Sequence, residues 1–185
     1  MKLLPLAALA LTLCTAHALE LEGVNVPEQT TVAGKPLKLN GAGVRTVTLA
    51  FIPIKAYVAA FYAPSKVGSE GAVEKSPGPL KFTFTFLQGV NQGQVTQAWN
   101  AQFKASASHD YPGLAKDQEQ FVKFFGPLSK MGVESVELVG DDTLVYDDGT
   151  LKGTVKGKDF QKAFLSMWFG SRPVMTSLKS SLLGK

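Results

Sequence analysis

The chain has 185 residues, a formal net charge of +4 at pH 7, and 45% hydrophobic against 18% charged residues. A chain of this size can form one domain around a single core, and no internal repeat or low-complexity segment divides it. The small positive charge comes without a basic run or interleaved aromatic and basic residues, which argues against nucleic acid as a partner.

The first 18 residues have the three parts of a cleavable export signal. Lys2 supplies a positive charge, an apolar run follows from Leu3 to Thr15, and Ala16-His17-Ala18 offers a small-x-small cleavage site. The apolar run is shorter than the about 20 residues that span a bilayer, so no transmembrane segment is predicted. We expect cleavage after Ala18 and a domain of residues 19–185 in the periplasm or outside the cell.

Cleavage would change the net charge and the cysteine content of the mature domain. Loss of Lys2 lowers the net charge from +4 to +3, and loss of Cys14 removes the only cysteine. A mature domain without disulfides, behind a signal of this form, favours a bacterial envelope compartment. His109 is then the only histidine, which argues against a histidine metal site or a Ser-His-Asp relay and gives haem a single histidine ligand. We expect no metal and no cofactor.

The first half of the mature chain is rich in β-branched and aromatic residues. These predict strands at Leu21–Val26, Leu37–Leu39, Val44–Phe51, Lys55–Tyr62 and Lys81–Leu87. The glycines of Asn40-Gly41-Ala42-Gly43 predict a bend, Pro53 predicts a bulge or a break, and residues 63–79 predict an exposed loop.

The second half changes to helical spacing and then returns to strands. We expect helices at Gln94–Ser108, Leu114–Phe125, Asp159–Phe169 and Pro173–Leu183, and strands at Val133–Val139, Thr143–Tyr146 and Leu151–Val155. Asp159 is expected to cap its helix, and Pro173 to occupy a first helical turn. The predicted fold class is α+β: an antiparallel sheet of six or seven strands with four helices laid against it.

Arg45 is the residue most suggestive of binding chemistry. The chain has 19 Lys and Arg residues but only two arginines, so arginine is not its general surface charge. Arg45 alternates in phase with Val47, Leu49 and Phe51, which places it on the apolar face of its strand. A guanidinium on such a face could receive the carboxylate, phenolate or enolate of a ligand. The alternatives are an internal ion pair or a strand-end arginine that reaches water.

Two tyrosines could assist Arg45. Tyr57 alternates with Ala59 and Phe61, and the small residues beside it would leave room for a ligand. Its hydroxyl could donate to that ligand or be satisfied by backbone inside the core. Tyr111 lies in a turn between two helices, where it is either a turn residue or a ligand contact.

Several segments, in their order and spacing, carry a resemblance. They are Leu37–Arg45, Lys55–Tyr62, Gly153–Phe160, Met167–Gly170, and Leu178-Lys179 with Leu182-Leu183-Gly184. Together they resemble the chalcone isomerase-like proteins, in particular the exported bacterial branch, over about Leu21 to Gly184. The resemblance implies an open-faced β-sandwich, a large antiparallel sheet covered by helices with a ligand cleft between the two layers.

The resemblance also implies roles for single residues. The arginine that polarises the substrate in the enzymes, or holds a carboxylate in the fatty-acid-binding relatives, falls on Arg45. The strand tyrosine that shares this carboxylate falls on Tyr57, and the helix tyrosine on Tyr111. The two threonines of the enzymes fall near Ile52-Pro53 and on Met167, ahead of Trp168, where no hydroxyl is available. Met167 and Trp168 are expected to line the pocket.

These departures favour binding without turnover. We expect a non-catalytic, monomeric protein that holds a small amphipathic anion such as a fatty acid. The alternative is an isomerase, an intramolecular lyase that cyclises a chalcone-like phenolic enone, with Arg45 as its catalytic residue. A third possibility is a structural or chaperone-like envelope protein whose cleft is filled by its own side chains.

Overall fold

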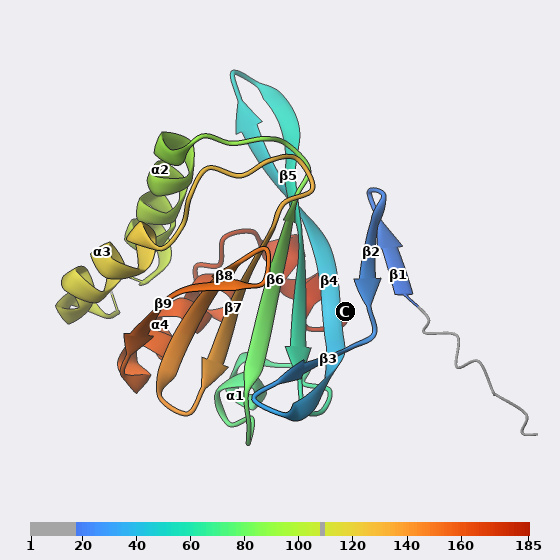
Figure 1. Cartoon of the computed structure of the whole chain (residues 1–185), viewed down its shortest axis with the longest axis vertical. Coiled ribbons are helices and arrows are strands. Elements are labelled where there is room, and N and C mark those ends of the chain that lie inside the picture. The colour runs from blue at the N-terminus through green and yellow to red at the C-terminus, as the bar shows by residue number, and fades with distance from the viewer. Residues whose placement is uncertain (1–17, 108–109) are drawn as a thin grey trace, which may run out of the picture.

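The computed structural model describes residues 18–107 and 110–185. The expected signal segment, except Ala18, and His109 lie outside the described residues. In the described part of the chain, β1 (Ala18–Leu21) and β2 (Val24–Pro27) form a separate two-stranded ribbon. Seven antiparallel strands form the main sheet in chain order (Figure 1): β3 (Gln29–Val32), β4 (Lys35–Leu49), β5 (Ile52–Ala63), β6 (Leu80–Phe86), β7 (Val133–Val139), β8 (Asp142–Asp147) and β9 (Thr150–Lys156).

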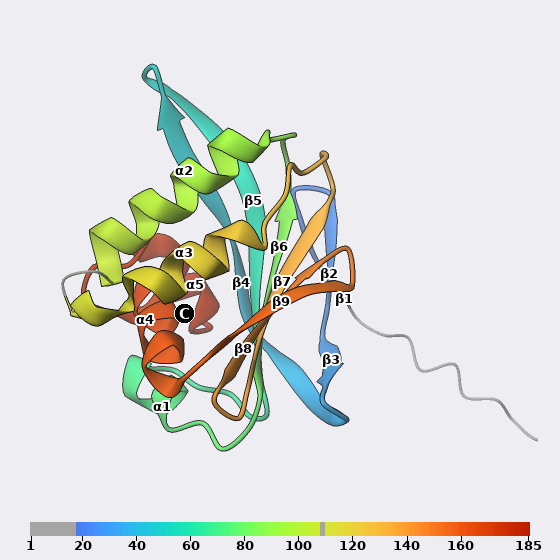
Figure 2. The same ribbon diagram turned by 60° about the vertical axis from the view of Figure 1, so that its left-hand side comes forward.

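Helices cover one face of this curled sheet, and the β1–β2 ribbon lies on its other side (Figure 2). The helices are α1 (Glu70–Glu74), α2 (Gln92–Gln102), α3 (Ala115–Lys123), α4 (Lys158–Phe169) and α5 (Thr176–Leu182). A π-helical turn (Phe103–Ala107) extends α2, and a 3-10 turn (Pro112–Leu114) precedes α3. The α+β class and the helix-covered antiparallel sheet are therefore confirmed. No helix among the described residues is both long and apolar enough to cross a bilayer.

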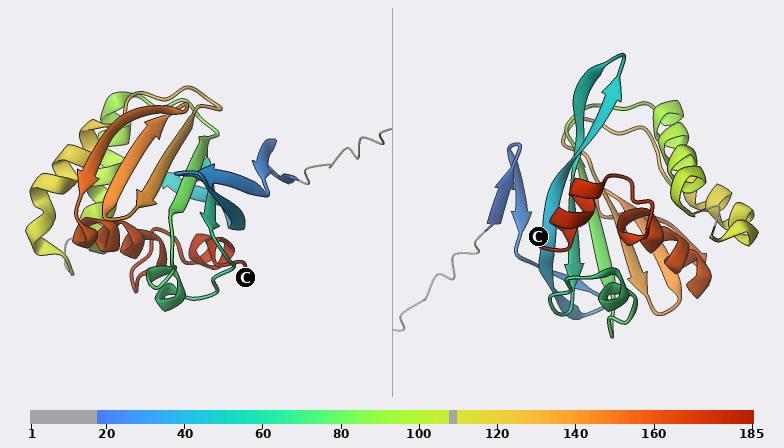
Figure 3. Two further views of the ribbon diagram at one scale, coloured as in Figure 1. Left: turned by 60° about the horizontal axis from the view of Figure 1, so that its bottom comes forward. Right: turned by 180° about the vertical axis from the view of Figure 1, so that it is seen from behind.

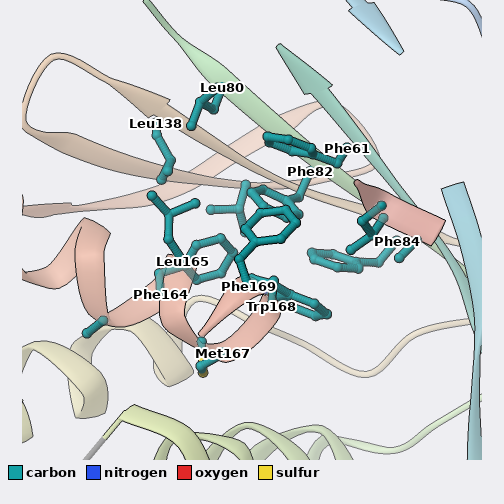
Figure 4. Close-up of a cluster of buried hydrophobic side chains, with 14 of the residues drawn as sticks. Phe61, Leu80, Phe82, Phe84, Leu138, Phe164, Leu165, Met167, Trp168 and Phe169 are labelled. Atoms are coloured by element: carbon teal, nitrogen blue, oxygen red, sulfur yellow. The ribbon is translucent and has the colours of Figure 1, made fainter. Parts of the chain in front are cut away.

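The main core lies between the helices and the sheet. Phe61, Phe82 and Phe84 project from β5 and β6 toward α4, as Figure 4 shows. Trp168 of α4 lies on Phe84 with ring centroids 5.0 Å apart, and Phe169 lies 5.0 Å from Phe61. A smaller core on the opposite face packs the β1–β2 ribbon against the sheet.

The bend expected at residues 40–43 is wrong, because these residues continue β4 through a register irregularity after Leu39. Their glycines instead admit α5, since a Cβ on Gly43 would lie 2.8 Å from Ser181 Cβ. The buried Asn40 amide donates to the carbonyls of Val67 and Leu182, at 2.9 and 2.7 Å. The segment thus anchors α5 on β4.

Near the N-terminus, the single strand expected at Leu21–Val26 is wrong. Glu22 and Gly23 both have positive φ and form a turn that divides it into β1 and β2. The sequence analysis also missed β3, which pairs with the start of β4. The expected loop over residues 63–79 contains α1, whose first turn is capped by the Ser69 side chain.

The ends of the last two helices also differ from expectation. Asp159 does not cap α4, because the helix begins at Lys158 and Gly157 precedes it. Pro173 lies outside α5, which begins at Thr176, seven residues after α4 ends. The right-hand view of Figure 3 shows these two helices next to each other on the helix-covered face of the sheet.

The expectation that the apolar residues after Arg45 face the core is wrong. Val47, Leu49 and Phe51 are 38%, 64% and 98% exposed. The reason is that β6 ends at the partner of Tyr57, so β4 and β5 continue beyond it as two unsupported strands. Figure 1 shows this hairpin projecting past the rest of the molecule.

Candidate ligand-binding site

Arg45 and Tyr57 lie directly opposite each other on β4 and β5. Tyr57 packs against the main core, so both side chains belong to the helix-covered side of the sheet. The next pair is Thr46 with Lys55, which leaves Ala56 as the extra residue of a β-bulge. A bulge redirects the strands locally, here at the root of the projecting hairpin. Two of the three residues expected to bind the ligand, Arg45 and Tyr57, are therefore brought together.

Arg45 is partly buried and has no carboxylate partner: no ion pair within the described residues involves it. Its guanidinium donates to the Thr46 carbonyl at 2.8 Å and hydrogen-bonds the Tyr57 side chain. Guanidinium has five N–H donors, so these contacts leave donors for a further acceptor. By contrast, Arg172 lies 3.7 Å from Asp110. An internal ion pair therefore does not explain the position of Arg45.

The Tyr57 ring lies between Phe84 and Phe86, with centroid distances of 5.5 and 5.4 Å. Burial raises the pKa of the Tyr57 hydroxyl above its ordinary value, while the charge and hydrogen bond of Arg45 oppose this effect. The phenol therefore keeps its proton at neutral pH and can donate it to a bound acceptor.

Glu134 is a further polar residue of this region, which the sequence analysis missed. It is directly opposite Phe84 in the sheet, is 1% exposed, and neither carboxyl oxygen has a hydrogen-bond partner. Burial, and secondarily the charge of Asp147, raises the pKa of Glu134 to about 9. The carboxyl is therefore neutral at pH 7 and does not compensate the charge of Arg45. Its alternation with Val136 and Leu138 was the available sequence signal.

The two residues expected to line a pocket lie differently on α4. Trp168 is 2% exposed, stacks on Phe84, and its indole nitrogen has no hydrogen-bond partner. Figure 4 places Met167 on the side of the helix away from this ring cluster, where it is fully buried. Trp168 thus borders the same aromatic interior as Tyr57, whereas Met167 packs elsewhere in the core.

Tyr111 does not join Arg45 and Tyr57. It stands just before the 3-10 turn and is partly buried against the main core. Burial raises its pKa, and the strongest charged influences on it are Glu74 and Lys162, on α1 and α4. Neither of these groups influences Tyr57.

A separate hollow of about 220 Å³ lies on the opposite face of the sheet. Residues of β2 and the outward-facing Val58, Ala60 and Tyr62 line it, and Arg45 and Tyr57 do not. Among the described residues, no three His, Cys, Asp or Glu side chains come together as metal ligands. The Arg45 region therefore presents spare N–H donors beside an aromatic interior.

Comparison with known proteins places this geometry in a family. The model of the chalcone isomerase-like family matches residues 18–184. The chain belongs to this family. None of the curated proteins compared with it matches. Among solved structures, a fatty-acid binding protein of Arabidopsis thaliana superposes with a TM-score of 0.68, at 13% identity, over 90% of this chain and 96% of that chain. The family resemblance and the chalcone isomerase-like fold are thereby confirmed.

Proposed function

We propose that this chalcone isomerase-like protein binds a small amphipathic anion, most suitably a fatty acid, without transforming it. The observation that carries the proposal is a partly buried Arg45 that has spare donors and no carboxylate partner among the described residues. The guanidinium of Arg45 keeps unused N–H donors, and a ligand carboxylate could accept from two of them in a two-pronged geometry. Tyr57 adds a hydroxyl donor beside it.

The surroundings of this pair suit an aliphatic tail. Tyr57 is in ring contact with Phe84, which is in turn in ring contact with Trp168 and Trp99, so a cluster of aromatic rings begins next to Arg45. A head group at Arg45 with its tail toward these rings would satisfy both charge and hydrophobic burial. The described fold is shared with a protein named for fatty-acid binding, which supports the same ligand class.

The proposal includes export. The lysine, apolar run and small-residue triplet of residues 1–18 support cleavage after Ala18 and a periplasmic or secreted location. Cleavage there would remove only the first residue of β1. Expression of the full chain in a bacterium, followed by mass measurement of the periplasmic product, tests this part: a product that begins at another residue or stays cytoplasmic contradicts it.

The binding test uses the two arginines as a matched pair. Palmitate binding is measured by native mass spectrometry and by displacement of a fluorescent fatty acid, for wild type, Arg45→Ala and Arg172→Ala. Loss of a charged hydrogen bond is worth about 1.5–3 kcal/mol, so Arg45→Ala should weaken binding about 10- to 100-fold. Arg172, exposed and paired with Asp110, should be dispensable. Equal binding by both variants, or none by wild type, would contradict the proposal.

Enone cyclisation is less well supported by the geometry. Ile52 lies 63% exposed on the projecting hairpin, away from any enclosed site, and Met167 is fully buried without a hydroxyl. Neither position can order water or move a proton beside Arg45. A chalcone cyclisation assay decides the matter: a rate above that of buffer, lost in Arg45→Ala, would establish the enzyme instead.

A further inference from the structure

The tip of the β4–β5 hairpin concentrates exposed apolar residues. Among the large hydrophobic residues exposed in the described part of the chain, four fall within residues 47–52: Val47, Leu49, Phe51 and Ile52. Phe51 is 98% exposed, and Leu49 and Ile52 are 64% and 63% exposed. Figures 1 and 2 both show the hairpin extending beyond every neighbouring element, which agrees with the high exposed fractions of these side chains.

The turn at this tip is built at a conformational cost. Ala50 and Phe51 connect the paired Leu49 and Ile52, and both have positive φ, at 47° and 68°. A two-residue turn of this kind prefers Asn-Gly, because side chains with a Cβ are strained there. A strained backbone at a fully exposed phenylalanine does not stabilise the fold. This points to a role of the Phe51 side chain in contact with another molecule.

The charged residues near the hairpin lie at its base and not at its tip. No charged residue occurs between Arg45 and Lys55, and the cation Lys130 lies on the exposed loop that enters β7. That loop belongs to the same rim, because the neighbouring Met131 donates its N–H to the carbonyl of Phe86, at the end of β6. Glu22 is the acidic partner of Lys55, at 2.7 Å. The hairpin is thus an uncharged apolar tip above a charged rim, on which Arg45, Lys55 and Lys130 are cationic and Glu22 and Asp148 are acidic.

We propose that this hairpin tip inserts into the surface of a phospholipid bilayer that contains anionic lipid. Phe51, Leu49 and Ile52 would enter the acyl boundary, while the exposed cations Lys55 and Lys130 would meet lipid phosphates. The exposed apolar side chains amount to roughly 400 Å², against about 800 Å² per partner in a standard protein interface, so the tip is small for a stable dimer. The inference does not require the proposed fatty-acid function, but it would place the Arg45–Tyr57 site next to the membrane.

A double substitution separates membrane docking from folding. Ala50→Asn with Phe51→Gly supplies the preferred turn residues and removes the most exposed ring, so this variant should fold at least as well as wild type. Leu151→Ser is the control, because Leu151 is 51% exposed on β9, at the opposite edge of the sheet. All proteins begin at Leu19, since the apolar run of residues 3–15 would bind lipid itself, and every described helix and the main sheet lie beyond it.

The measurement is flotation with vesicles of phosphatidylethanolamine and phosphatidylglycerol, compared with phosphatidylcholine vesicles, alongside sedimentation without lipid. Wild type and Leu151→Ser should float with the anionic vesicles and less with the neutral ones, and the double variant should bind at least about tenfold more weakly. Absence of wild-type flotation, or equal flotation of the double variant, overturns the proposal. A third outcome also overturns the proposal: wild type and Leu151→Ser form a dimer, the double variant does not, and no protein floats. That result assigns the tip to contact with a second copy of the chain. Palmitate binding in solution should survive the double substitution, so this test and that of Arg45 can fail independently.

Discussion

Glu134→Gln should change how the stability of the protein depends on pH. In the folded protein the pKa of Glu134 is raised to about 9, mainly by burial, from an ordinary value of 4.5. Between these values the folded state holds a proton that the unfolded chain has released. The free energy of unfolding therefore falls as the pH rises, by about 1.4 kcal/mol per pH unit.

The size of this effect is measurable. The contribution is fully present below the unfolded value of 4.5 and is lost as the pH rises toward 9. From about pH 5 to about pH 8, three units at about 1.4 kcal/mol each give a loss of about 4 kcal/mol. Domains of this kind have a total stability of about 5–15 kcal/mol, so the loss is a large part of it.

Urea unfolding of wild type and Glu134→Gln at several pH values isolates this group. Glutamine cannot titrate, so the difference in unfolding free energy should move in favour of the variant by about 4 kcal/mol across this range. Any fixed cost of burying an amide shifts the difference equally at every pH. Glu28→Gln, at an exposed carboxyl, should leave the wild-type slope in place. A difference that does not vary with pH would refute the burial of a neutral Glu134.

Two further predictions concern stability. Asn40→Ala removes the side chain that satisfies the Val67 amide and the Leu182 carbonyl, and should lower the free energy of unfolding by about 2–4 kcal/mol in urea titrations. An unchanged midpoint would show that Asn40 does not anchor α5. The Ala50→Asn, Phe51→Gly variant relieves the strained turn and should raise that free energy by about 1–2 kcal/mol; a lower value would mean that the native turn is not strained.

Local alternation explains where the sequence analysis succeeded. The period-2 pattern of residues 81–87 and the fourfold spacing after Gln94 predict β6 and α2, because each element has one buried face. Arg45 and Tyr57 stood out for the same reason, and the structure pairs them. Glu134 carries that signal too, in phase with Val136, but a lone carboxylate in a strand resembles an ordinary surface residue until its neighbours are known.

The errors fall where the outcome depends on distant segments. The glycines at 41 and 43 predict a bend by local conformational freedom, but they are needed because α5, about 140 residues later in the chain, packs against them. Alternation also predicted that Leu49 and Phe51 share an apolar face turned to the core, but Leu49 is exposed at the end of β4 and Phe51 lies in the turn beyond it. Whether such a face is covered depends on where β6 ends, which is not encoded in residues 44–51.

The sequence by itself determined that Arg45 is an unusual charge on an apolar strand face, since residue type and alternation are local properties. It also determined the family, since the segments that carry the resemblance keep their order along the chain. Only the tertiary structure decided that Arg45 faces Tyr57 without a carboxylate partner in the described chain, and that Glu134 lies buried across the same interior. It alone decided that the residues beyond Arg45 project into solvent. Pairing and burial arise from segments far apart in sequence, and a strand's own residues cannot specify which of them will meet.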